Sequence, residues 1–342
     1  MPTIYIAGGS SGAGTTAVAS GLATLLERKG SEVTLAKALR VGFSAPPDAD
    51  AAFHQSLFPQ NAAPAGWPTS VEHVPDASAL DEVIAKLKDA NLPQGITIVD
   101  GVSGDISDTE RIRLDGALAQ VLDATVILVS NGTSAPPEQV AQAFAGRLIG
   151  AIINSVPDHA MHQAATAITA SFEQQGIAVL GVIPETRRML ALTVGEIAEH
   201  LGAELINAAA LKSPDERMGE LVEYFMLGGL FLDKGAYVFG RRENKAVIVR
   251  GDRPDLQMAA LDTSTACLIL TNGKTPIQYI AHHAGLRQTP MMATPAPTLE
   301  TMEKLHSIGD RGSVRSTHKA QCFAELLEVH CNLEALTAKA PN

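Results

Sequence analysis

A glycine-rich stretch near the start of the chain has residue types and spacing suited to holding phosphate. An apolar run at 3–7 leads into the sequence Gly8-Gly9-Ser10-Ser11-Gly12-Ala13-Gly14, and the pair Thr15-Thr16 then opens an alanine-rich helix. Phosphate-binding loops follow the pattern Gly, four residues, Gly, Lys, then Ser or Thr. The sequence has Gly9, Gly14 and Thr16 at the required offsets, but Thr15 holds the lysine position.

Backbone N–H groups at the start of a helix attract anions, and glycine allows the positive φ angles that turn those groups toward one. We therefore predict a site for the phosphates of ATP or another nucleotide. Its residues are Gly9, Ser10, Gly12, Ala13, Gly14, Thr15 and Thr16. The alternative is a tight strand-to-helix turn that binds no ligand.

The missing lysine has an energetic consequence for this site. A charge contact at ~4 Å near a protein surface is worth about 4 kcal/mol before screening, whereas the helix dipole usually contributes ~0.3–1 kcal/mol. We expect Lys37, at the end of the second predicted strand, to supply the lost charge as a catalytic residue. Arg40 is a second candidate, and the alternative for Lys37 is a lysine that only faces solvent.

Carboxylates near the predicted strand ends are candidates for holding Mg²⁺. Asp100 ends the apolar run Ile96-Thr97-Ile98-Val99, a position where a magnesium ligand is expected beside a phosphate loop. Asp48 and Asp50 lie in an irregular, proline-rich segment and are further candidates, although acids there also cap turns and helices. We predict a metal site of Thr16, Asp50 and Asp100.

The elements that must position these residues alternate between strand and helix. Apolar runs predict strands at 3–7, 32–36, 95–100, 124–129, 148–154 and 178–183, and the intervening patterns predict helices at 15–29, 77–90, 108–122, 137–144 and 162–175. Continuous Val/Ile/Leu runs are typical of parallel strands that are covered on both faces. The expected fold class is α/β, a mainly parallel sheet with helices on both faces.

A second alternation follows a polar stretch near 206–215. It predicts strands at 245–249, 266–271 and 290–293, with helices at 254–261, 275–284, 299–307 and 316–329. The expected domains are 1–208 and a smaller α/β domain at 209–342. Two turns follow strands of the second domain and form a candidate ligand or interface site: Asp252, Arg253, Thr271, Asn272 and Gly273. The alternative for the first turn is a helix cap with a surface ion pair.

Composition restricts the classes of partner. The 342 residues are 46% hydrophobic, and the net charge of −11 disfavours nucleic acid and anionic membrane, both of which need a basic face. No apolar run approaches the ~20 residues of a membrane-spanning helix. Three cysteines without metal-ligand spacing favour a reducing compartment, so we expect a cytoplasmic protein.

The stretch Gly8–Thr16, with Lys37, Asp50 and Asp100-Gly101, resembles the P-loop proteins of the dethiobiotin synthetase and cobyrinic acid diamide synthase type. Residues 176–206 narrow this resemblance to the N-terminal region of long bacterial phosphate acetyltransferases, in which a DRTGG domain follows. Here "VRGDRPDLQMAAL" and "LILTNGKTP" match the two signature turns of that domain. The resemblance covers about residues 1–330. It implies a P-loop NTPase-like domain and a DRTGG-type domain, without the acetyltransferase domain.

Three functions follow from the resemblance and its departures. The first, which we favour, is a nucleotide-binding regulatory or sensor protein that acts on a metabolic enzyme, forms a homo-oligomer and binds a nucleotide or small metabolite. The second is an ATP-dependent ligase that activates a carboxylate by phosphorylation. The third is a scaffold that has lost nucleotide binding. Thr15 in place of lysine, and Asn272 in place of the usual glycine, are the departures. Because Asn tolerates the left-handed conformation, we expect the second turn to persist.

Overall fold

The protein is represented by a computed structural model that describes residues 2–42, 49–61, 63, 67, 69–88, 95–131, 139–144, 146–229, 235–308 and 312–336. The chain forms two compact units, residues 1–186 with 319–342, and residues 187–318. These units do not coincide with the predicted domains 1–208 and 209–342. Two features account for the difference: residues 187–208 pair with strands of the second unit, and the last helices return to the first unit.

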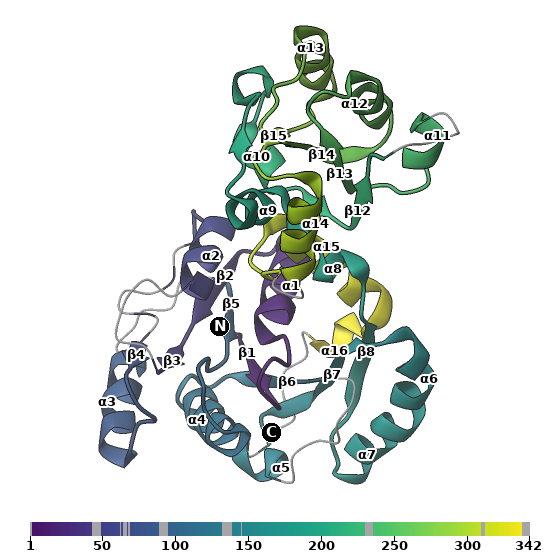
Figure 1. Ribbon diagram of the computed structural model, residues 1–342. Helices are drawn as coiled ribbons and strands as arrows, with labels where there is room; N and C mark the ends of the chain where they lie inside the picture. Colours follow the sequence, from purple (N-terminus) through teal and green to yellow (C-terminus); the bar gives the residue numbers. More distant parts are fainter. Residues whose placement is uncertain are drawn as a thin grey trace. The chain divides into compact units, whose positions relative to one another are not determined.

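A six-stranded parallel sheet in the order β2-β5-β1-β6-β7-β8 forms the centre of the first unit (Figure 1). The strands of this unit are β1 (Thr3–Gly8), β2 (Val33–Lys37), β3 (Leu39–Val41), β4 (Thr69–Val71), β5 (Ile96–Asp100), β6 (Thr125–Asn131), β7 (Leu148–Val156) and β8 (Val179–Pro184). Short strands β3 and β4 pair separately in a parallel two-stranded sheet.

Helices cover both faces of this sheet. They are α1 (Thr15–Arg28), α2 (Ala49–Leu57), α3 (Ala77–Lys88), α4 (Asp108–Val121), α5 (Val140–Ala143), α6 (Met161–Gln163), α7 (Thr169–Gln174), α15 (Thr317–His330) and α16 (Leu333–Leu336), with a 3₁₀ turn at Asp158–Ala160 and a π-helical turn at Ala164–Ile168. On one face, Tyr5 and Ala7 pack with Leu114 and Leu118 of α4. Side chains alternate along a strand, so Ile4 and Ile6 point to the other face, where α1 contacts β1, β2 and β5.

The second unit contains a smaller sheet in the order β10-β15-β14-β13-β12. Its strands are β9 (Leu192–Thr193), β10 (Glu204–Leu205), β11 (Leu221–Val222), β12 (Tyr224–Leu227), β13 (Lys245–Arg250), β14 (Thr265–Thr271) and β15 (Met291–Ala293). Strand β10 is antiparallel to β15, the other neighbours in this sheet are parallel, and β9 pairs separately with β11.

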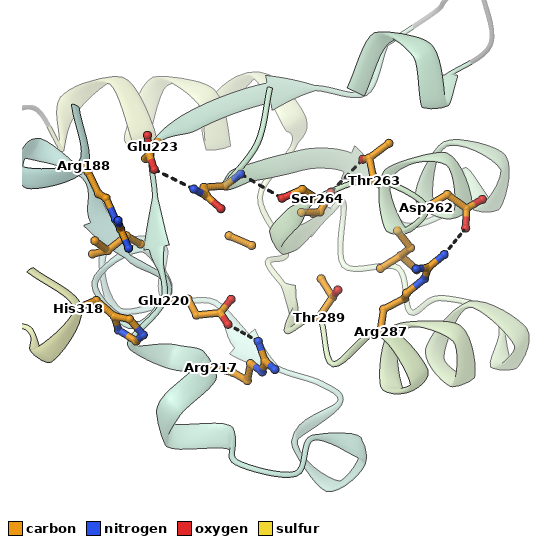
Figure 2. Close-up of a pocket in the computed structure, with 15 residues that line it drawn as sticks. Arg188, Arg217, Glu220, Glu223, Asp262, Thr263, Ser264, Arg287, Thr289 and His318 are labelled. Atoms are coloured by element: carbon orange, nitrogen blue, oxygen red, sulfur yellow. Dashed lines mark hydrogen bonds and ion pairs between the residues drawn. The ribbon is translucent and has the colours of Figure 1, made fainter. Parts of the chain in front are cut away.

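The helices of the second unit lie on both faces of its sheet. They are α8 (Arg187–Leu190), α9 (Val194–Leu201), α10 (Pro214–Met218), α11 (Gly235–Phe239), α12 (Pro254–Leu261), α13 (Gln278–Arg287) and α14 (Thr298–Ser307), with a 3₁₀ turn at Ala208–Ala210. Ile248 packs with Ile197 of α9 and Leu305 of α14, whereas its neighbour Val249 packs with the α11–α13 side. A cavity opens at the amino ends of β13 and β14 (Figure 2).

The structure therefore confirms the α/β class: two mainly parallel sheets, each with helices on both faces. Among the described residues, no helix has the length and apolar character needed to cross a membrane. The predicted helix at 137–144 is shorter, at Val140–Ala143, and residues 132–138 lie outside the described part of the chain. Asp48 also lies outside it.

Candidate functional site

The glycine-rich loop leaves the central strand β1 and enters α1, as the sequence predicts. Gly12 and Gly14 have φ values of 70° and 94°, in the left-handed region that favours glycine. The Gly9 N–H donates to the carbonyl of Val129 on β6 at 2.8 Å, and the Ala13 N–H donates to the Ser10 carbonyl at 3.3 Å. The loop is therefore held as a closed turn at the carboxyl edge of the sheet.

Asn154, at the end of β7, is a support of this loop that sequence reasoning missed. Its Nδ2 donates to the Ala13 carbonyl at 3.0 Å, and its side chain fills the space that a Cβ at Gly14 would need. Asn154 is buried. Its signal in the sequence is weak, a single amide after an apolar strand, because only the strand order brings β7 close to the loop.

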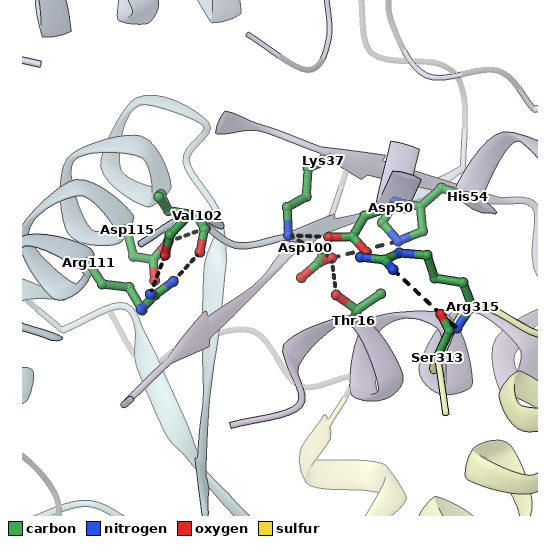
Figure 3. A network of polar contacts seen from close by, with 11 residues as sticks. Thr16, Lys37, Asp50, His54, Asp100, Val102, Arg111, Asp115, Ser313 and Arg315 are labelled. Atoms are coloured by element: carbon green, nitrogen blue, oxygen red, sulfur yellow. Dashed lines mark hydrogen bonds and ion pairs between the residues drawn. The ribbon is translucent and has the colours of Figure 1, made fainter. Parts of the chain in front are cut away.

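The register of β2 and β5 brings the predicted charged residues together. Lys37 and Asp100 are direct partners in the parallel ladder, and both side chains are buried. The Lys37 Nζ lies 2.9 Å from Asp100 Oδ2 and 3.5 Å from Asp50 Oδ2 (Figure 3). The solvent-facing alternative for Lys37 is therefore wrong, because its ammonium bridges two carboxylates inside the protein.

Thr16 completes this cluster from the start of α1. Its hydroxyl donates to Asp100 Oδ2 at 2.8 Å, and the ring of His54 on α2 lies 3.7 Å from the same oxygen. The other oxygen, Asp100 Oδ1, is buried and has no hydrogen-bond partner among the described residues. Thr16, Lys37, Asp50 and Asp100 thus lie together, and His54 joins them without having been predicted.

The donor set around Asp100 fits Mg²⁺. The ion usually takes one or two oxygen ligands from the protein and completes its shell with water and phosphate oxygens. Thr16 Oγ1 and the unpartnered Asp100 Oδ1 are oxygens of this kind. Asp50 differs, since its carboxylate faces the Lys37 ammonium. A direct metal contact by Asp50 therefore stays a prediction, as does the whole ligand set.

A carboxylate from α4 contacts the loop. Asp108 Oδ1 accepts a hydrogen bond from the Ser11 N–H at 2.9 Å. Asp108 is the first residue of α4, directly after Ser107, whose side chain forms a capping box with Glu110. An N–H group of the loop is therefore bonded to an acid of the protein itself. The helix-start pattern predicts the cap, but it does not reveal that the neighbouring acid reaches the loop.

A second buried acid, Asp115 of α4, supports the base of the loop (Figure 3). It accepts hydrogen bonds from the Tyr5 hydroxyl and the Val102 N–H, both at 2.8 Å, and from the Gly8 N–H at 3.3 Å. Burial raises the pKa of Asp115 to about 6, and the three hydrogen bonds oppose this shift. The pKa of Tyr5 is raised well above its usual value by burial and by Asp115.

The predicted residues of the second unit lie at the carboxyl ends of β13 and β14. Both turns share one edge, because Arg250 pairs with Thr271 in the ladder. Asn272 and Gly273 have φ values of 66° and 60°, so the turn adopts the left-handed conformation that we expected. The Thr271 hydroxyl is hydrogen-bonded to the Thr298 hydroxyl at 2.7 Å.

The first of these turns consists of exposed ion pairs. Asp252 bonds to Arg250, which lowers the pKa of Asp252, and Arg253 bonds to Asp255. Arg253, rather than Asp252, is the N-cap of α12, and its side chain makes no capping bond. A ligand or interface role for these turns stays a prediction.

Comparison with known proteins identifies both units. Residues 2–191 match the family described as an AAA domain, and residues 196–308 match the DRTGG domain. The phosphate acetyltransferase of Pseudomonas putida is 25% identical, over 96% of this chain and 50% of its own length. The enzyme of Nitrosomonas europaea is 26% identical, over 76% of this chain and 39% of its own length. The chain therefore spans half or less of these relatives.

Solved structures match the chain only at low similarity. The cell division protein MinD of Aquifex aeolicus is 15% identical, covers 56% of this chain and 85% of its own, and has a TM-score of 0.35. Cobyrinic acid a,c-diamide synthase of Mycobacterium smegmatis, solved with ADP and magnesium, is 17% identical. The match covers 55% of this chain and 87% of the synthase chain, with a TM-score of 0.34. The chain belongs to the AAA-domain family that its residues 2–191 match, carries a DRTGG domain, and is related to the N-terminal region of phosphate acetyltransferase.

Proposed function

We propose that the protein is a nucleotide-binding regulatory protein whose first unit binds ATP or ADP with Mg²⁺ but turns it over poorly. The observation that carries the proposal is the pairing of Lys37 with Asp100 and Asp50. A lysine that already bridges two buried carboxylates has little charge left to offer a phosphate. The loop itself has Thr15 where the lysine of the pattern stands.

Binding without efficient turnover follows from the groups that remain. The backbone N–H groups at the start of α1 and the positive end of its dipole can hold phosphate oxygens. Mg²⁺ at Thr16 and Asp100 would neutralise part of the phosphate charge. Phosphoryl transfer also needs a cation on the transferred group, since catalysis of this reaction is mostly positioning and electrostatic stabilisation.

Isothermal titration with ATP and ADP, each with and without Mg²⁺, tests the proposal, together with an assay of phosphate release. We expect Mg²⁺-dependent binding that is lost in Thr16→Ala, and slow release of phosphate. Thr24→Ala is the matched control, because Thr24 lies on the same helix and its hydroxyl bonds only to the Ser20 carbonyl. The proposal would be contradicted if neither ATP nor ADP binds, with or without Mg²⁺.

A second candidate, carboxylate activation by ATP, is favoured by the position of Lys37 alone. Its ammonium lies beside Asp100 and hence beside the expected metal. If a bound substrate displaced Asp50, Lys37 could contact the transferred phosphoryl group. Phosphate release that a carboxylate stimulates, and that Lys37→Met abolishes, would support this function over the regulatory one.

The regulatory proposal includes a partner and a compartment. The relatives are phosphate acetyltransferases, so we propose a metabolic enzyme as the protein partner. Self-association into a homo-oligomer is a further part of the proposal, and sedimentation of the purified chain tests it. Cys267, Cys322 and Cys331 are present as thiols, and the first two are buried, which supports the proposal of a reducing, cytoplasmic location.

A further inference from the structure

The cavity at the amino ends of β13 and β14 lies in the second unit, at the edge of the sheet opposite to the predicted turns. It has a volume of about 560 Å³, within the ~300–1,000 Å³ typical of small-molecule sites. All of its lining residues belong to the second unit. None of them was singled out by the sequence, because they come from separate segments that only the fold brings together.

The wall of the cavity carries three guanidinium groups, those of Arg188, Arg217 and Arg287 (Figure 2). Four residues with hydroxyl groups also line the cavity: Thr263, Ser264, Thr265 and Thr289. Guanidinium groups present several N–H donors in a planar fork that matches carboxylate and phosphate oxygens. A wall of this composition is suited to a ligand that is rich in acceptor oxygens.

The carboxylates of the wall are already bonded within the protein. Glu220 pairs with Arg217, and Glu223 accepts from the Asn244 amide at 2.9 Å. Asp262 lies 3.2 Å from the His283 ring and 3.5 Å from Arg287. These bonds reduce the capacity of the three acids to bind a cation. Arg217 and Arg287 each have five N–H donors, more than these ion pairs use.

A lysine under the wall adds to the positive charge. The Lys245 Nζ donates to Thr263 Oγ1 at 3.0 Å and to the Ser264 carbonyl at 2.6 Å. Burial lowers the pKa of Lys245 to about 8, so it remains mostly protonated at neutral pH. The lining itself carries three arginines and three carboxylates, and Lys245 lies beneath it with the carboxylate of Glu243 close enough to raise its pKa against the effect of burial.

We propose that this cavity binds a small anionic metabolite that carries phosphate or carboxylate groups, held by Arg188, Arg217 and Arg287. The inference goes beyond the proposed nucleotide function, which concerns the first unit, and gives the second unit a ligand site of its own. It differs from the predicted turns at Asp252 and Asn272, which lie at the other edge of the same sheet. The ligand would lie between two ion pairs, Arg217–Glu220 and Arg287–Asp262, and would compete with each acid for its arginine.

Titration of the full chain with inorganic pyrophosphate and with citrate tests the site, and the two probes separate a phosphate ligand from a carboxylate ligand. We expect one or both to bind in the millimolar range or tighter. Arg287→Gln should weaken binding at least tenfold. Arg250→Gln is the matched control, since it removes an exposed, paired arginine from the other edge of the sheet.

Three further variants test the direction of the effect and guard against misfolding. Arg217→Gln leaves Glu220 without its cation, so R217Q/E220Q is measured beside it and should also bind more weakly. Glu220→Gln alone should bind the anion more tightly, because it frees Arg217. Melting temperatures with and without each probe show whether a variant is folded.

The proposal is overturned if neither probe binds, or if Arg287→Gln binds like the wild type. Binding that Thr16→Ala removes and Arg287→Gln leaves intact would place the anion at the glycine-rich loop instead and would also overturn it. A different result separates the two proposals: no nucleotide binds at the loop, but pyrophosphate or citrate binds and this binding depends on Arg287. That result would contradict the proposed nucleotide function and would support the anion site.

Discussion

Lys37 and Asp100 form a buried ion pair, with Nζ 2.9 Å from Oδ2, at the point where β2 and β5 end side by side. Thr16 donates to the same carboxylate oxygen. The lysine that we expected to replace the missing charge of the loop is thus bonded to Asp100, the acid that we propose as a metal ligand. This arrangement supports our proposal that the first unit binds a nucleotide but turns it over poorly.

The Lys37–Asp100 ion pair predicts how single and double variants differ in their free energy of unfolding. Lys37→Met should lower the free energy of unfolding by about 3–5 kcal/mol, because removal of one partner leaves a buried charge uncompensated. The double variant K37M/D100N should recover part of this loss. The single tryptophan, Trp67, packs against the core of the first unit, so its fluorescence during urea unfolding reports that unit. A double variant no more stable than Lys37→Met would argue against an uncompensated charge.

Two glycines of the loop should differ in their sensitivity to alanine. Both have positive φ, which costs roughly 1–2 kcal/mol for an alanine. A Cβ at Gly14 would also collide with the Asn154 amide, whereas a Cβ at Gly12 meets nothing within 4 Å. Urea unfolding should therefore show a clearly larger loss for Gly14→Ala than for Gly12→Ala. Equal losses would mean that Asn154 does not hold the loop.

Asp108 should oppose anion binding, because its carboxylate accepts the Ser11 N–H at 2.9 Å. Asp108→Asn removes the negative charge and should tighten nucleotide binding severalfold, with a smaller gain at high salt. Asp123→Asn is the control, since it removes one exposed acid that pairs with Arg147 elsewhere in the unit. Titration of both variants with ATP and Mg²⁺ checks this prediction, and an equal gain in the two would assign the effect to net charge alone.

Asp115 should make the stability of the first unit depend on pH. Its folded pKa is about 6, above the usual 3.8, so between these values the folded state binds more protons than the unfolded state. Stability from this group is therefore greatest below about pH 4 and falls as pH rises to about 6. The shift corresponds to roughly 3 kcal/mol.

Asp115→Asn removes this titration. The stability of the wild type relative to Asp115→Asn should therefore fall between pH 4 and pH 7, as measured by Trp67 fluorescence in urea. The asparagine also loses an acceptor for the Gly8 or Val102 N–H, and this cost does not vary with pH. A difference that stays constant, or grows with pH, would refute the raised pKa.

The sequence predicted the parts of the fold that have a local signal. The strands that hold Lys37 and Asp100 are confirmed to within a residue or two, since buried parallel strands read as uninterrupted apolar runs. The same holds for β13, β14 and β15. The short strands β9, β10 and β11 were missed, because two residues carry no periodicity.

Contacts that depend on strand order were beyond the sequence. The predicted strand ends placed Lys37 near Asp100, but nothing in the sequence showed that Asp108 and Asn154 reach the loop from α4 and β7. The return of α15 to the first unit, where Phe323 packs on Gly21, has no signal in either segment. The cavity lined by Arg188, Arg217 and Arg287 was missed for the same reason, since these arginines are dispersed over some hundred residues.

The most direct test of the central claim is to restore the lysine with Thr15→Lys and to measure ATP binding and phosphate release beside the wild type. A phosphate site that lacks only its principal charge should gain at least tenfold in affinity for ATP with Mg²⁺, and its slow phosphate release should rise. Thr15→Gln, which adds length without charge, should gain neither. Fast phosphate release by the unaltered protein, or unchanged affinity in Thr15→Lys, would contradict the account.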